Sequence, residues 1–309
     1  SECADSWTIS RMTTRIAVIG GSGLYEIDGV KFLDHVEVST PYGNPSDRIS
    51  IAEMGGARVA FLPRHGRGHR FLPSEVPSRA NIWALKSLGV TQIISISAVG
   101  SLSEEYPPGS FALPDQLIDR TIRRPNSFFG DGVVGHVSFA EPFCPGMRER
   151  IAVVLGRTGH AFRGQGTLVC MEGPAFSSRA ESLLHRSWGA HLIGMTASPE
   201  AKLAREAELC YATVAMVTDW DCWRGEGEGV TLEMVLATMR QNVQDIKRAL
   251  PALVGTLAGR GDFRSLLALL KRAVAEFNAV PVCEAPVPVV GVLGEIFDVY
   301  ARTVEPWDY

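Results

Sequence analysis

The sequence lacks any pair of cysteines with the spacing of a zinc site or a redox motif. Six cysteines are scattered through its 309 residues: Cys3, Cys144, Cys170, Cys210, Cys222 and Cys283. This dispersal is typical of reduced thiols in a cytosolic protein, where several serve as core residues. A chain of this length buries a large core without disulfides or a structural metal. We therefore expect neither a disulfide framework nor a metal site.

Long apolar runs and an excess of basic residues are lacking as well. No run reaches the roughly 18 apolar residues of a membrane span, and residues 1–6 have neither the basic nor the apolar region of a signal peptide. The formal net charge is −4, whereas a general nucleic-acid binder needs a basic excess. We expect a cytoplasmic protein without a membrane or nucleic-acid partner. A small anionic substrate remains compatible, because it needs only one or two well-placed cations.

What the sequence does contain is an alternation of short apolar runs with helical segments. This alternation predicts an α/β fold, with a central mixed β-sheet flanked by helices. Strands are expected at residues 15–19, 59–62, 92–99, 111–119, 166–171 and 212–217, helices at 80–88, at 178–188 and after 231, and a long loop at 123–146.

Two of the predicted strands end in motifs suited to an anion. Gly20-Gly-Ser-Gly23 offers backbone N–H groups and the Ser22 hydroxyl, although glycines are common at strand ends. It lacks the third glycine of a dinucleotide fingerprint, which disfavours a dinucleotide oxidoreductase. Pro63-Arg-His-Gly66 follows the next strand, and Arg64 can grip a phosphate in a bidentate fork. The alternative is a solvated arginine beside a structural His65.

A third motif, Thr218-Asp-Trp-Asp221, ends the last predicted strand. Its two carboxyl groups could bind a metal, act as acid and base, or point into solvent, and the metal is disfavoured because no His/Asp cluster lies nearby. A carboxyl group can also bridge a purine, accepting from the exocyclic amine and donating to N7 when protonated. His136, in the long loop, is by itself more typical of a structural histidine.

Taken together, these segments resemble the methylthioadenosine phosphorylase branch of the purine nucleoside phosphorylase family. The similarity runs in order from about residue 15 to 250. It rests on Ile19-Gly-Gly-Ser-Gly-Leu24, Pro41-Tyr-Gly-Asn-Pro-Ser46, Arg64-His-Gly-Arg67, Ala80-Asn-Ile-Trp-Ala-Leu85, Ser97-Ala-Val-Gly-Ser-Leu102, Ala140-Glu-Pro-Phe-Cys144, Met171-Glu-Gly-Pro-Ala-Phe-Ser-Ser-Arg-Ala-Glu181, Met195-Thr196 and Thr218-Asp-Trp-Asp-Cys-Trp223.

The resemblance implies the organisation of the chain. Residues 15–255 are expected to form a nucleoside phosphorylase domain, after an N-terminal tail at 1–14. Residues 256–309 do not match the family and are expected to form an atypical extension that packs on the domain or on a neighbouring subunit. Family members with this signature are typically trimers, so a homotrimer is expected.

The resemblance also implies a site with three parts. The phosphate part comprises Ser22, Arg64, His65, Ser97, Ala98 and Thr196. The part for the base and ribose comprises Phe176, Ser177, Met195, Thr218, Asp219 and Asp221. The slot for the 5' group comprises Leu232, Val235 and Leu236, with His136 supplied by a neighbouring subunit.

Residue differences within the family point to adenine as the base. Relatives that prefer 6-oxopurines use an Asn and a Glu around the base, where this chain has Asp219 and Ser177. A carboxylate accepts a hydrogen bond from a 6-amino group, and a mismatched polar pair costs about 1–3 kcal/mol. This chain also departs from many relatives at Ala175, where they have Arg, and in the glycine-rich residues 225–229.

The implied activity is phosphorolysis of 5'-methylthioadenosine to adenine and 5-methylthioribose 1-phosphate, the reaction of a pentosyltransferase in purine and methionine salvage. Inorganic phosphate is the co-substrate, and no cofactor or metal is expected. Arg64 and His65 would hold phosphate beneath C1', and Asp219 would assist the leaving base at N7. The alternatives are a phosphorylase of methylthioinosine, 5'-deoxyadenosine, adenosine or inosine, a hydrolytic nucleosidase, and a non-catalytic nucleoside-binding protein.

Overall fold

The structure is a computed structural model that describes residues 14–21, 30–224 and 232–259. Its elements, in chain order, are β1 (Ile16–Gly20), β2 (Lys31–Val36), β3 (Ile49–Met54), β4 (Ala57–Pro63), α1 (Ser78–Ser87), β5 (Gln92–Ser101), β6 (Phe111–Ala112), β7 (Gln116–Asp119), α2 (Pro145–Leu155), β8 (Phe162–Arg163), β9 (Thr167–Cys170), α3 (Arg179–Ser187), β10 (Leu192–Gly194), α4 (Ala197–Glu206), β11 (Cys210–Asp219) and α5 (Leu232–Gly259).

The strands form one mixed sheet, as the sequence predicts. At its centre β4, β1, β5 and β11 run parallel to one another in that order. β2 and β3 extend the sheet beyond β4 as antiparallel strands. β10 pairs with the carboxyl end of β5, and β9 and β7 continue the sheet from there. The parallel strands in the middle bring their carboxyl ends to one edge, which is where α/β proteins bind ligands.

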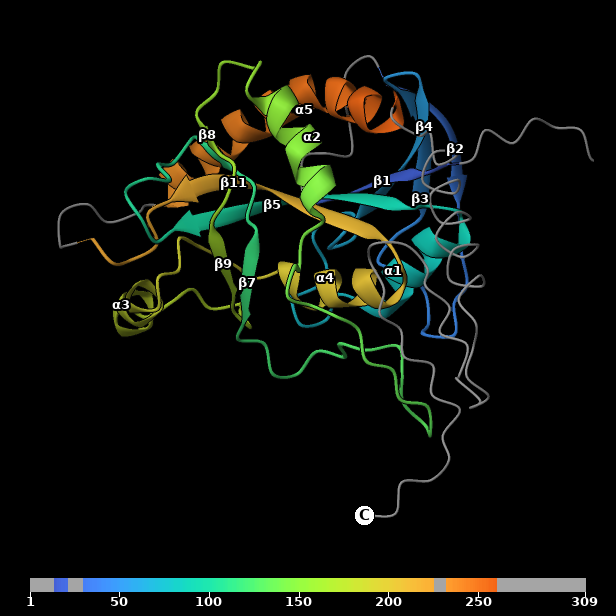
Figure 1. Ribbon diagram of the computed structural model, residues 1–309, viewed down its shortest axis with the longest axis horizontal. Coiled ribbons are helices and arrows are strands. Elements are labelled where there is room, and N and C mark those ends of the chain that lie inside the picture. Colours follow the sequence, from blue (N-terminus) through green and yellow to red (C-terminus); the bar gives the residue numbers. More distant parts are fainter. Residues whose placement is uncertain (1–13, 22–29, 225–231, 260–309) are drawn as a thin grey trace, which may run out of the picture.

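Helices cover both faces of this sheet. Figure 1 shows α2 and α5 on one face and α1 and α4 on the other, with α3 at one end. Successive residues of β1 alternate between the two cores: Ile16 and Val18 pack with α2 and α5, whereas Ala17 and Ile19 pack with α1 and α4. A strand covered on both faces is apolar throughout, which is why these strands are readable as continuous apolar runs.

Several expected elements are confirmed and others need correction. α1 ends before Gly89, and α3 before Gly189, and both glycines have positive φ angles of 85° and 77°, as the C′ position of a helix requires. The strand expected at residues 111–119 is two strands, β6 and β7, because Pro114 separates them. The loop expected to reach residue 146 ends earlier, since Pro145 begins α2.

β5 changes partners along its length, and this change creates room for a site. It pairs with β1 up to Ser95 and with β10 from Gly100 onward, while β11 follows it on the other side. Residues 96–99 of β5 therefore lie between the last residue paired with β1 and the first residue paired with β10.

The predicted N-terminal tail and C-terminal extension fall mostly outside the described residues. Thr14 and residues 256–259, which end α5, are the only parts of them that the structure describes. No helix in the described ranges is long and apolar enough to cross a membrane.

Candidate active site

A cavity of about 340 Å³ lies at the carboxyl ends of the parallel strands. Its walls come from segments that are far apart in sequence. The lining includes Gly21, Arg64, His65, His69, Pro73, Ile96, Ser97, Ala98, Val99, Gly100, Met171, Phe176, Ile193, Gly194, Met195, Thr196, Met216, Thr218, Asp219, Asp221, Leu236 and Met239.

Most of the residues selected from the sequence meet in this cavity. Eleven of them line it: Arg64, His65, Ser97, Ala98, Phe176, Met195, Thr196, Thr218, Asp219, Asp221 and Leu236. Ser22 lies outside the described residues, next to the lining residue Gly21, and the side chains of Leu232 and Val235 are likewise not described. Ser177 and the exposed His136 are not part of the cavity wall within this chain.

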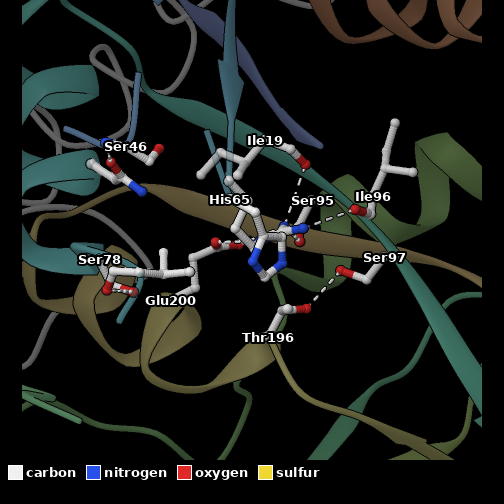
Figure 2. A network of polar contacts seen from close by, with 12 residues as sticks. Ile19, Ser46, His65, Ser78, Ser95, Ile96, Ser97, Thr196 and Glu200 are labelled. Atoms are coloured by element: carbon white, nitrogen blue, oxygen red, sulfur yellow. Dashed lines mark hydrogen bonds and ion pairs between the residues drawn. The ribbon is translucent and has the colours of Figure 1, made fainter. Parts of the chain in front are cut away.

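Arg64 is almost completely buried, with 2% of its surface exposed. Its Nε and Nη2 atoms donate to the two carboxylate oxygens of Glu200, at 2.8 and 3.0 Å. Nη1 donates to the carbonyl of Ile96 at 3.0 Å, and Nη2 also donates to the Ser95 hydroxyl at 2.7 Å. The bidentate edge that sequence reasoning assigned to phosphate is thus bound to a carboxylate of the protein. Figure 2 labels the acceptors Glu200, Ser95 and Ile96 around it.

Glu200 is the main site residue that sequence reasoning missed. It lies in α4, is 1% exposed, and accepts a further hydrogen bond from the Tyr211 hydroxyl at 2.8 Å. Burial raises the pKa of Tyr211 well above its usual value, so this hydroxyl keeps its proton and remains a donor. Nothing in the sequence distinguishes Glu200 from an ordinary surface glutamate of a helix, because one partner directly follows β4 and the other lies on β11.

His65 is held in a neutral form by its surroundings. Burial, and then the neighbouring charge of Arg64, lower its pKa to about 4. Its Nδ1 lies 2.9 Å from the carbonyl oxygen of Phe71, so in the neutral ring Nδ1–H donates to that carbonyl and Nε2 keeps a lone pair. The ring stacks on His69, with centroids 4.3 Å apart.

Two hydroxyl groups face each other beside these side chains. Ser97 lies in the middle of β5, in the interval between the pairings with β1 and β10. Thr196 directly precedes α4, and its Oγ1 is 3.0 Å from the Ser97 Oγ. Figure 2 shows this pair close to His65. Hydroxyls can donate or accept, so this corner of the cavity is suited to the oxygens of an anion.

The carboxyl groups of Asp219 and Asp221 lie where β11 ends. The register between β5 and β11 shifts between Val217 and Asp219, and a bulge of this kind re-aims the side chains that follow it. A Cβ on Gly100 would lie 3.0 Å from the Asp219 Oδ1, so the missing side chain gives this carboxyl room. Asp219 Oδ1 accepts from the Asp221 backbone N–H at 2.8 Å, and Oδ2 accepts from the Thr218 hydroxyl at 2.7 Å.

Asp221 differs from its neighbour in its backbone and in its electrostatics. Its φ angle is 54°, a left-handed conformation that aspartate tolerates better than most residues. Burial raises its pKa, and the nearby charge of Asp219 acts in the same direction. Two adjacent carboxyls in a cavity favour the retention of a proton, because both cannot be charged without mutual repulsion.

Arg124 is a second missed residue, and it holds two walls of the cavity in place. Its Nη1 donates to the carbonyls of Met195 and Ser198 at 2.6 and 2.7 Å. Its Nη2 donates to the carbonyls of Glu172 and Met171 at 2.6 and 3.2 Å. One buried guanidinium therefore ties the segment after β9 to the segment after β10.

The described residues contain no group of three or more His, Cys, Asp or Glu side chains able to hold a metal ion. The polar side chains that line the cavity are instead the hydroxyls, the imidazoles of His65 and His69, the guanidinium of Arg64 and two carboxyls.

Comparison with known proteins agrees with this arrangement. The family model of the phosphorylase superfamily matches residues 15–255. S-methyl-5'-thioadenosine phosphorylase of Chloroflexus aurantiacus is 56% identical over 229 residues, which are 74% of this chain and 80% of the relative. The enzyme of that name from Geobacter sulfurreducens is 48% identical over 267 residues, covering 86% of this chain and 93% of the relative.

Solved structures give the same picture. A methylthioadenosine phosphorylase from an antarctic soil metagenomic library superposes with a TM-score of 0.77 at 46% identity, covering 81% of this chain and 88% of that one. A variant of adenosine/methylthioadenosine phosphorylase from Schistosoma mansoni, in complex with methylthioadenosine, gives 0.77 at 35% identity, covering 85% and 98%.

Proposed function

This chain belongs to the phosphorylase superfamily, and from that premise we propose that it catalyses the phosphorolysis of 5'-methylthioadenosine. The products are adenine and 5-methylthioribose 1-phosphate, so the enzyme is a pentosyltransferase. The proposal is supported by curated relatives of that activity at about half identity over most of the chain.

One observation carries the proposal. A single cavity has a pair of hydroxyls with a neutral imidazole at one end, Ser97, Thr196 and His65, and two carboxyls, Asp219 and Asp221, at the other. A nucleoside places its anomeric carbon between a base and the face that a nucleophile attacks. The two ends thus match phosphate and purine, with C1' between them.

At the phosphate end, the groups suit a hydrogen phosphate dianion. The Ser97 and Thr196 hydroxyls donate to phosphate oxygens, and the Nε2 lone pair of His65 accepts a hydrogen bond from the phosphate O–H. Arg64 supplies positive charge from behind, where Glu200 fixes its orientation. Holding phosphate in line with C1' removes much of the entropic barrier, and the dianion stabilises the oxocarbenium-like sugar as the bond to the base breaks.

At the base end, Asp219 assists departure of adenine at N7. The raised pKa of Asp221 keeps a protonated carboxyl beside Asp219 at a higher pH than an isolated aspartate would. A carboxyl here also accepts from the 6-amino group, whereas a 6-keto oxygen would repel it. This difference favours adenine over hypoxanthine or guanine.

The 5' end of the cavity is incompletely enclosed within this chain. Leu236, of the 5' slot, is 40% exposed and Phe176, of the base pocket, is 77% exposed, although both line the cavity. We propose that a neighbouring subunit of a homotrimer covers this end and contributes His136, and that Leu232 and Val235 complete the slot. The reaction uses inorganic phosphate as co-substrate and needs no cofactor, and the protein acts in the cytoplasm.

One assay tests the activity. The protein is incubated with 5'-methylthioadenosine, with and without phosphate, and adenine and the pentose 1-phosphate are quantified. Adenine release that depends on phosphate is the expected result, with methylthioinosine and adenosine cleaved less efficiently. Release without phosphate would identify a nucleosidase, and no release in either arm would leave only nucleoside binding.

A substitution tests the role of Asp219. Asp219→Ala removes the group that serves N7, so turnover should fall about a hundredfold or more, the usual contribution of a general acid. Unfolding temperature serves as the control for the fold. Turnover close to that of the unsubstituted enzyme would contradict the assignment.

A further inference from the structure

Two cysteines lie side by side at the end of the sheet remote from the cavity. Cys144 immediately precedes α2, and Cys210 is the first residue of β11, whose last residue, Asp219, reaches the cavity. Their sulfur atoms are 3.1 Å apart. Both thiols are free and both are partly exposed. Neither lines the cavity, so the pair stands apart from the proposed active site.

The backbone around both residues is firmly held. The Cys144 N–H donates to the carbonyl of Tyr211 at 2.8 Å, and the Cys210 N–H donates to the carbonyl of Thr91 at 2.9 Å. A disulfide bond is about 2.05 Å long. The sulfur atoms therefore need to approach by only about 1 Å.

The charges nearby favour a thiolate at Cys144. The hydrogen bond between the two thiols lowers the pKa of Cys144 against the effect of burial, and the positive charges of Arg150 and Arg205 add to the lowering. The backbone N–H of Met147, at the start of α2, acts in the same direction. A thiolate is the nucleophilic form of cysteine, and low-pKa cysteines with some exposure are the ones that oxidants attack.

We propose that Cys144 and Cys210 form a reversible intramolecular disulfide when the protein meets hydrogen peroxide. The Cys144 thiolate attacks one peroxide oxygen, the O–O bond breaks, and the leaving hydroxide takes up the proton that the thiol had lost, giving a sulfenic acid and one water. The Cys210 sulfur then attacks the sulfenic sulfur, and its S–H proton leaves with the hydroxyl as a second water. Two thiols and one peroxide thus give one disulfide and two waters, with the sulfurs oxidised and the peroxide reduced.

The bond would connect the start of α2 to the start of β11, residues that are 66 apart in sequence. Such a cross-link restricts the unfolded chain, and more so for a long loop. The oxidised protein is therefore expected to unfold several degrees higher than the reduced protein. This inference does not depend on the proposed catalytic activity.

Intact-mass spectrometry of the full chain tests the proposal. After reduction and removal of the reductant, stoichiometric hydrogen peroxide should lower the mass by two hydrogens, and dithiothreitol should restore it. Proteolysis without reduction should yield one linked peptide pair, containing Cys144 and Cys210. Thermal unfolding of the same samples should show the rise in Tm and its reversal.

Matched variants separate this pair from the other cysteines. Cys144→Ser and Cys210→Ser should each lose both the mass decrease and the Tm rise. Cys222→Ser and the double variant Cys3→Ser/Cys283→Ser should keep both. Oxygen addition at Cys144 while Cys210 stays alkylatable, or linkage of any other cysteines with this pair still reduced, would overturn the proposal. The wild-type measurement decides this even if a serine variant fails to fold.

Discussion

At His65, burial sets the protonation state and therefore the chemistry. An imidazole near its ordinary pKa of 6.5 would be partly cationic at neutral pH and would repel Arg64. The lowered pKa of about 4 makes it neutral instead, and the hydrogen bond to Phe71 chooses which nitrogen carries the proton. The histidine could be selected from the sequence because it follows a buried strand, but its charge state depends on surroundings that only the fold supplies.

This shift has a consequence for stability in acid. Between pH 6.5 and about 4 the unfolded chain binds a proton at His65 that the folded protein does not. The stability due to neutral His65 is therefore fully present above pH 6.5 and is lost as the pH falls toward 4. We expect His65→Asn, which keeps a donor for Phe71 but does not titrate, to lose less free energy of unfolding over this range, by at most about 3 kcal/mol.

Urea denaturation at several pH values between 4 and 7.5 measures this difference. For each protein the free energy of unfolding is plotted against pH, and the two slopes are compared. The slope, unlike the absolute stability, does not include the packing lost with the imidazole ring. Parallel slopes for the two proteins would show that His65 does not titrate differently on folding.

The ion pair between Arg64 and Glu200 is the residue-scale feature that the sequence conceals. Its partners are 136 residues apart, and no local pattern links them. Glu200→Gln would leave the buried guanidinium without its counter-charge, which typically costs 3–5 kcal/mol. We expect that loss of stability together with at least a tenfold fall in kcat/KM, because the guanidinium behind the phosphate end of the cavity would lose the partner that fixes its position.

Tyr211→Phe is the matched control for that substitution. It removes one donor to Glu200 and leaves the ion pair intact, so its cost should be near 1 kcal/mol. Chemical denaturation and steady-state kinetics on both variants give the comparison. Equal effects from the two substitutions would mean that the hydroxyl, rather than the charge of Glu200, holds Arg64.

At the scale of elements, the sequence predicted the four parallel strands at the centre of the sheet and missed β2, β3, β8 and β10, together with the helices α2 and α4. β1, β4, β5 and β11 contain apolar runs, and their ends carry the motifs that meet in the cavity. β10 is only three residues long, and α4 contains Pro199 and a non-helical Ser198 near its start. Such elements exist because tertiary packing favours them, so local periodicity does not reveal them.

The turn between β3 and β4 packs closely against helix α5. Gly55 has a φ angle of 56°, and a Cβ there would lie 2.4 Å from the Pro251 carbonyl oxygen of α5. Gly56 has a φ of 78° and nothing within 4 Å of its Cβ position. Gly56→Ala should therefore cost about 1–2 kcal/mol for conformation alone, and Gly55→Ala should cost a further 1–3 kcal/mol for overpacking.

The two alanine variants are one residue apart in the same turn. The difference between their free energies of unfolding, measured by heat and by urea, therefore reports the contact with α5. Equal stabilities for the two variants would mean that the turn does not rest on the helix.

At the scale of the whole molecule, the isolated chain leaves apolar surface at its own cavity uncovered. Phe176 and Leu236 line the cavity and are nevertheless exposed, as are Val133 and Val134 in the loop that carries His136. Apolar groups that line a ligand site gain from removal of water. The sequence resemblance predicts a trimer, and these exposed positions are where a neighbouring subunit would give the greatest gain.

Light scattering coupled to size-exclusion chromatography tests the assembly, with an expected mass of about 100 kDa, three times the 33.5 kDa of one chain.

If a neighbour's His136 closes the 5' slot, His136→Ala should raise the KM for 5'-methylthioadenosine severalfold and change the KM for phosphate little, because phosphate binds at the other end of the cavity. Tm should hardly change, since His136 is exposed in the subunit. A fully active monomer, or a KM unaffected by the substitution in an intact trimer, would place His136 away from the slot.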